Sequence, residues 1–163
     1  MNRTRKMTTI AMCIALAVVF HSIEAQIPIP LPVPGFHFGI ANIVGLIVLY
    51  KYDAKEMLSV NLLRCIFVGI LRGTLFSYIF WMSFCGVFLS SFAAILLKKM
   101  SGLSIVGISV VSSVVHCVGQ ILVAMIVYSQ ALMLAYLPFL LVMSIPTGIM
   151  TGTIANLVLK RIK

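Results

Sequence analysis

The chain has 163 residues, of which 62% are hydrophobic and only 9% charged, and its mean hydropathy is +1.18. These values exclude an ordinary soluble domain, in which about 25% of residues are charged, and they leave no room for a soluble catalytic domain. The formal net charge of +9 comes from 12 Lys and Arg residues in small clusters between apolar runs. This pattern indicates membrane topology and no nucleic-acid partner.

Six apolar segments, taken in chain order, predict an all-α polytopic membrane protein with one domain over residues 1–163. They run over residues 7–26, 38–50, 57–71, 74–97, 103–128 and 132–159. A membrane-spanning helix needs about 20 apolar residues. The second segment is too short to meet this length comfortably, so a re-entrant segment is the alternative there.

The basic residues favour six crossings over a re-entrant second segment. With six crossings, both termini lie on the inner side together with ten of the Lys and Arg residues. With a re-entrant second segment, only four Lys and Arg residues would lie on the inner side. Lys and Arg concentrate in cytoplasmic loops, so both termini are predicted to be cytoplasmic. The basic start also resembles a signal peptide, but His21 and Glu24 interrupt its apolar run and no small-residue cleavage site follows. The first helix is therefore predicted to be retained.

A proline-rich loop over residues 27–37 separates the first two segments. Its prolines alternate with apolar residues at positions 28, 30, 32 and 34. Proline lacks an N–H and disfavours helical backbone in the residue before it. The loop is predicted to be a stiff extended strap on the outer face, either a rigid connector or a lid over a site that opens outward.

Ionisable residues inside apolar segments are costly and often mark a functional cavity. Glu24 and His21 lie one turn apart near the end of the first segment, and Glu24 is either a counter-ion to Arg64 or Arg72 or a ligand contact. Arg64 in the third segment requires an anion. Asn42 lies near the start of the second helix, where free N–H groups would also favour an anion.

The fifth segment carries a polar stripe formed by Ser109, Ser112, His116 and Gln120. Their spacings of three, four and four residues place them on one helical face. Hydrogen bonding between helices is one interpretation, but the histidine favours a lined cavity. The four cysteines stand alone, so no metal site is predicted.

Small residues recur every fourth position in two segments. The last segment has Ser144, Gly148 and Gly152, and the first has Ala11 and Ala15. This spacing lets helices approach closely. Packing within the bundle is the simplest interpretation for both.

Several of these features together resemble one family of small bacterial membrane proteins. It is called the Gx transporter family or heptaprenyl diphosphate synthase component I, and it is related to the S-components of energy-coupling factor (ECF) vitamin transporters. The resemblance covers almost the whole chain. It rests on Ile23-Glu24, Pro34-Gly35, Gly39-Ile-Ala-Asn42, Arg64, Ser104-Ile-Val-Gly-Ile-Ser109 and His116-Cys-Val-Gly-Gln120. Two positions depart from it, because the family usually has Lys at His37 and Asn at Cys117.

The resemblance implies a six-helix substrate-binding bundle in the bacterial inner membrane, with an outward-facing site under the first loop. Its partners would be a small, anionic or vitamin-like substrate, membrane lipid, a transmembrane coupling subunit that contacts Ala11 and Ala15, and a separate ATPase module. No phosphate-binding loop occurs in this chain, and no cofactor is expected. The substrate-facing residues would be Glu24, His37, Asn42, Arg64, His116 and Gln120.

Two other functions stay open. Prenyl diphosphate synthases hold Mg²⁺ with aspartate-rich motifs, and this chain has a single aspartate, Asp53. It is therefore predicted not to be an enzyme, although a non-catalytic accessory role in prenyl diphosphate or menaquinone synthesis is one alternative. The other is a proton-coupled secondary carrier that uses Glu24 and His116.

Overall fold

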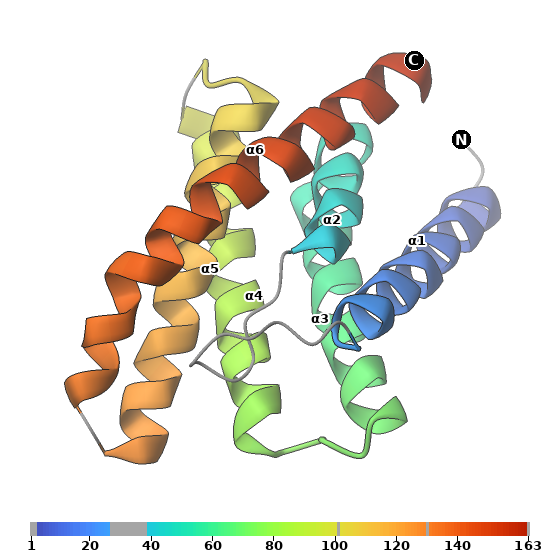
Figure 1. Cartoon of the computed structure of the whole chain (residues 1–163). Coiled ribbons are helices and arrows are strands. Elements are labelled where there is room, and N and C mark those ends of the chain that lie inside the picture. Colours follow the sequence, from blue (N-terminus) through green and yellow to red (C-terminus); the bar gives the residue numbers. More distant parts are fainter. Residues whose placement is uncertain (1–2, 27–38, 101, 130, 163) are drawn as a thin grey trace.

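The computed structural model describes residues 3–26, 39–100, 102–129 and 131–162, and it confirms the all-α class over that part of the chain (Figure 1). The proline-rich loop and His37 lie outside the described residues. Within the described residues, six α-helices and one 3₁₀ helix follow one another. They are α1 (Arg3–Glu24), α2 (Ile40–Lys51), α3 (Ala54–Leu71), α4 (Tyr78–Met100), α5 (Ile105–Tyr128), η1 (Ala131–Tyr136) and α6 (Leu137–Ile162).

The helices run alternately up and down, so that both ends of the chain lie at the same end of the bundle (Figure 1). Nine Lys and Arg residues of the described helices gather there: Arg3, Arg5, Lys6, Lys51, Lys55, Lys98, Lys99, Lys160 and Arg161. We call this the basic end. Two contacts fasten it, because Lys6 of α1 pairs with Glu56 of α3, and Lys98 of α4 donates to the Leu49 carbonyl of α2 at 2.6 Å.

Four helices are long and apolar enough to cross a membrane, namely α1, α4, α5 and the segment Leu134–Ile162 that contains α6. The two remaining helices do not meet that standard. α2 has only 12 residues, and α3 carries Lys55, Glu56 and Arg64 within its 18 residues. Six crossings therefore stay a prediction, while a helical membrane protein with several spans is well supported.

Each helix begins two to five residues from the start of its predicted segment, and two of these differences have a local explanation. The fourth helix begins at Tyr78 instead of residue 74, because Gly73 and Phe76 have left-handed backbone with φ of 64°, and the Ser77 hydroxyl accepts from the Phe80 N–H at 3.3 Å. The last α-helix begins at Leu137, after η1. Pro138 follows directly, in the first turn where proline is tolerated.

Glycines let α4, α5 and α6 pack closely. A Cβ on Gly119 of α5 would lie 2.9 Å from the Cα of Gly86 in α4, and one on Gly148 of α6 would lie 2.7 Å from the Cα of Val110 in α5. These distances are shorter than the ordinary contact of about 3.4 Å or more. The small residues of the last segment therefore pack inside the bundle, as predicted.

The bundle is apolar outside and partly polar inside. Large apolar side chains such as Ile126 and Val142 are exposed, as a lipid environment permits, whereas twelve polar or charged side chains are buried. An apolar core with Leu46, Leu49 and Val60 lies toward the basic end. Some of the buried polar groups lie farther along the bundle and line the cavity described next.

Candidate functional site

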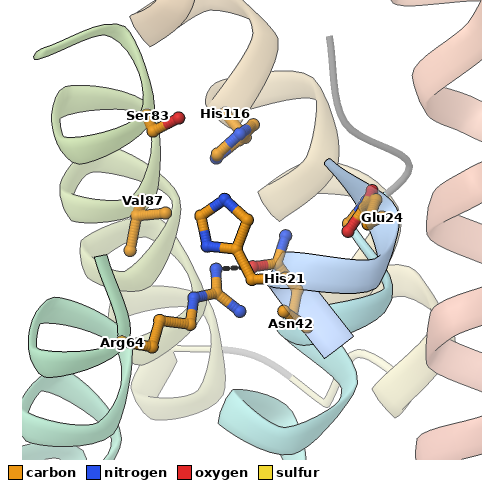
Figure 2. A pocket seen from close by; sticks show the side chains of 9 residues that line it. His21, Glu24, Asn42, Arg64, Ser83, Val87 and His116 are labelled. Carbon is orange, nitrogen blue, oxygen red and sulfur yellow. Dashed lines mark hydrogen bonds between the residues drawn. The ribbon is translucent and has the colours of Figure 1, made fainter. Parts of the chain in front are cut away.

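A small polar cavity lies inside the bundle, where the first five helices meet. Its walls come from α1 to α5 and from Gly39, the residue before α2. The lining residues are His21, Glu24, Gly39, Ala41, Asn42, Arg64, Ser83, Val87 and His116. Figure 2 shows their side chains around the cavity. Its free volume is about 10 Å³, room for about one water molecule.

Arg64 is the cation of this cavity. It lies in the middle of α3 and is only 3% exposed. Its Nη2 donates to Oδ1 of Asn42 at 2.5 Å, drawn as a dashed line in Figure 2. The Nε and Nη1 groups of Arg64 have no hydrogen-bond partner among the described residues. A buried guanidinium with unused donors is costly, and a carboxylate or phosphate could accept from it in a bidentate manner.

Glu24 lies on the far side of the cavity and caps α2. Its buried carboxylate accepts a hydrogen bond from the N–H of Gly39, and the N–H groups of Ile40 and Ala41 also interact favourably with its charge. Gly39 has φ of 77° and α2 has no side-chain cap of its own. A negative charge at a helix N-terminus is favourable, so a residue of α1 stabilises the start of α2.

This geometry bears on two expectations. Among the described residues, Glu24 forms no ion pair within 4.0 Å with Arg64 or Arg72. The positive charge of Arg64 nevertheless acts on Glu24 without direct contact. The N–H groups at the start of α2, expected to be free for an anion near Asn42, are occupied by Glu24.

Two histidines complete the polar wall. His21 of α1 and His116 of α5 are each 7% exposed and, with Ser83 of α4, surround the space beside Arg64 (Figure 2). Gly86 lets α4 come close to this wall, because a Cβ there would lie 3.0 Å from Cε1 of His116 and 3.1 Å from Cγ of Gln120.

A second polar cavity, also with about 10 Å³ of free volume, adjoins the first and shares Asn42 with it. The Nδ2 of Asn61 donates to the Ser91 hydroxyl at 2.8 Å, and the Ser109 and Thr151 hydroxyls are 2.9 Å apart. The Oδ1 of Asn61 and the Ser112 hydroxyl have no hydrogen-bond partner in the described part of the chain. The polar stripe of α5 thus continues past His116 into this second cavity.

Four of the six predicted site residues line the first cavity, namely Glu24, Asn42, Arg64 and His116. Gln120 is buried one turn beyond His116 but does not line it, and His37 is outside the described residues. The sequence reasoning had not placed His21 in the site, although its spacing of three from Glu24 carried that signal. It also missed Ser83, whose only signal is its place one turn before Gly86.

Ala11 and Ala15 are both exposed on α1. They do not pack inside this chain, unlike Gly148 and Gly152. Their face of the helix is free for lipid or for another polypeptide.

The described residues contain no group of three or more His, Cys, Asp or Glu side chains that could hold a metal ion. What the bundle does contain is a buried cation with open donors beside two histidines and an asparagine. Such a set can bind an anion or a group rich in hydrogen-bond acceptors.

An apolar outer surface, helices long enough to span a membrane and a partly polar interior define a helical membrane protein with a small polar cavity inside it. The sequence model of the family described as heptaprenyl diphosphate synthase component I matches residues 13–158. The chain belongs to this family, which confirms the resemblance given above. Comparison with curated proteins and with solved structures gives no significant match.

Proposed function

We propose that this protein is the membrane substrate-binding subunit, similar to an S-component, of an ECF-type importer for a small anionic or vitamin-like compound. The observation that carries the proposal is the buried Arg64 with two nitrogens that bond to no described residue. The chain has only three Asp and Glu residues. Glu24 is engaged by α2, and Asp53 and Glu56 lie near the basic end, so an anion from outside the chain would complete the site.

The cavity as it stands is too small for a ligand. A pocket for a small ligand has a volume of roughly 300–1,000 Å³, far more than the present 10 Å³. α1 is the least buried of the four long apolar helices, and it contributes both His21 and Glu24. We therefore expect α1 to move when a ligand enters, and the cap on α2 to loosen.

The exposed face of α1 supports a partner contact. Ala11 and Ala15 allow close approach of a second helix, and the resemblance assigns this face to the coupling subunit. Transport would then draw energy from a separate ATPase module, with the basic end of this chain in the cytoplasm of a bacterial cell. Catalysis is no part of the proposed role.

A second candidate function follows from the family description alone. A component of heptaprenyl diphosphate synthesis would work beside a catalytic prenyltransferase, to which this chain would contribute a membrane anchor or product site. This role predicts a soluble prenyltransferase among the proteins that purify with the chain. It makes no prediction about Arg64.

The test is gentle purification of tagged protein from its native membrane, with mass spectrometry of the proteins and small molecules that accompany it. Three forms are compared: the native sequence, Arg64→Met, and the matched control Arg72→Met, which removes an arginine whose bond to the Ala25 carbonyl is long, at 3.4 Å. Size-exclusion profiles check folding. Loss of one partner of a buried charged hydrogen bond costs about 2–5 kcal/mol, a decrease in affinity from about 30-fold to several thousand-fold.

We expect an anionic metabolite and an ATPase module with the native and Arg72→Met forms, and loss of the metabolite alone with Arg64→Met. Retention of the metabolite by Arg64→Met would refute the binding site. A prenyltransferase in place of the ATPase would favour the second candidate. Uptake that survives ATP depletion but needs the proton gradient would favour a carrier.

A further inference from the structure

A pocket larger than the two polar cavities opens at the basic end, away from Arg64. It lies between the end of α2, the start of α5 and the end of α6, and it has a free volume of about 400 Å³. Ile105, Leu159 and Ile162 give it apolar walls, while Lys51 and Lys160 lie at its rim with Tyr50. We call it the basic groove.

The two lysines of the basic groove are available for a ligand. Both are exposed, and among the described residues neither has a hydrogen-bond or ion-pair partner. Two other lysines at this end are engaged, since Lys6 pairs with Glu56 and Lys98 donates to the Leu49 carbonyl. None of the described residues that line the groove carries a carboxylate. Two like charges beside an apolar cleft thus face outward without compensation.

The groove also lies where a membrane surface is expected. α4, α5 and α6 are long and apolar enough to cross a bilayer, and the groove lies at the helix ends where the positive charges gather. Pockets of this kind, basic at the rim and apolar inside, suit the headgroups of anionic lipids on the cytoplasmic side of membranes. A neutral or cationic ligand would leave the two ammonium groups without a partner.

We propose that the basic groove binds one anionic phospholipid, with Lys51 and Lys160 on its phosphate and the apolar walls against the upper part of its acyl chains. The volume admits the glycerophosphate region and the first methylene groups, while the remaining chains lie along the exposed apolar surface of the bundle. The inference is independent of the importer role, since it uses none of the residues around Arg64.

The test measures lipid binding to the whole purified protein in a neutral detergent. Dioleoyl phosphatidylglycerol, dioleoyl phosphatidylcholine and soluble glycerol 3-phosphate are titrated separately, and native mass spectrometry records the bound fraction. The paired variant Lys51→Gln/Lys160→Gln is compared with Lys55→Gln/Lys99→Gln, which removes two charges from the same end but outside the groove. Thermal unfolding in detergent alone verifies that both variants are folded.

We expect phosphatidylglycerol to bind to the native protein and to the control pair, and phosphatidylcholine to bind far more weakly. The groove pair should bind phosphatidylglycerol about 30-fold more weakly, from the ordinary contribution of two lysines beside an anionic lipid surface. Equal losses in both pairs would reduce the effect to general charge and overturn the site. Equal binding of the two lipids, or glycerol 3-phosphate binding as tightly as the lipid, would overturn it too. So would cross-linking of a polypeptide, in place of lipid, from Asn156→Cys in native membranes.

Discussion

Gly148→Ala tests the packing of α6 on α5 most directly. The added Cβ would lie 2.7 Å from the Cα of Val110, about 0.7 Å short of an ordinary contact. That neighbour is backbone and cannot rotate away, so the helices have to separate. A gap of this size forfeits about a quarter to a half of the dispersion energy at the contact. It would also carry the hydroxyls of Ser109 and Thr151, now 2.9 Å apart, beyond hydrogen-bond distance.

Overpacking of this kind costs about 1–3 kcal/mol, and a hydrogen bond between membrane helices adds about 0.6 kcal/mol. We therefore expect Gly148→Ala to lower the free energy of unfolding by about 2–3 kcal/mol, a change of roughly 30- to 150-fold in the unfolding equilibrium. The single tryptophan, Trp81, reports unfolding by fluorescence during denaturant titration in detergent.

Gly107→Ala is the matched control on α5. Its Cβ would be 3.5 Å from the Ser104 hydroxyl, an ordinary contact, and alanine favours helix over glycine by up to about 1 kcal/mol. We expect this variant to be as stable as the native protein or more so. If Gly148→Ala proved as stable as Gly107→Ala, the close packing of α5 and α6 derived above would be wrong.

Two further predictions concern other contacts. Gly45→Ala would place a Cβ 2.5 Å from Oδ1 of Asn61 and disturb the hydrogen bond between Asn61 and Ser91. The substitution should therefore destabilise the native protein, and it should cost much less in an Asn61→Ala background. Equal costs in the two backgrounds of this double-mutant cycle would contradict the contact. Lys6 holds the pKa of Glu56 below its usual range through a hydrogen bond. The stabilisation by this pair is present above the unfolded carboxyl pKa and is lost as pH falls through the lower folded pKa. The melting temperatures of the native and Glu56→Gln proteins should therefore differ at pH 7 and converge below about pH 4. A constant difference in melting temperature across that range would count against the pair.

Hydropathy and charge predicted the helices well, because a membrane-spanning helix needs only a long apolar run and leaves its basic residues at one end. Local backbone effects were harder to predict. Phe76 adopts left-handed backbone, although glycine and asparagine are the residues that usually signal it. For this reason α4 begins four residues later than predicted. The predicted order of six helices is correct. Membrane crossing by α2 and α3 stays a prediction, because α2 is short and α3 carries three charged residues.

The candidate site was predictable at the level of residue type. Arg64, Glu24, Asn42 and His116 stood out because polar groups in apolar segments are costly. Their pairing could not be predicted, since a sequence gives no distances between helices. Glu24 had an arginine as its obvious partner, yet the N-terminus of α2 offers several N–H groups together and satisfies its carboxylate instead.

The cap that Glu24 provides for α2 has a consequence for how the protein is made. α2 is about 18 Å long, too short to be stable alone or to cross a bilayer easily. Its N–H groups are satisfied by a residue that lies earlier in the chain, and α1 leaves the ribosome first. By the time α2 emerges, the residue that caps it has already been synthesised. Because of this chain order, Glu24 is available to cap α2 as soon as that short helix forms. A rearranged gene that began at α2 would have to insert that helix with its N-terminal N–H groups uncapped.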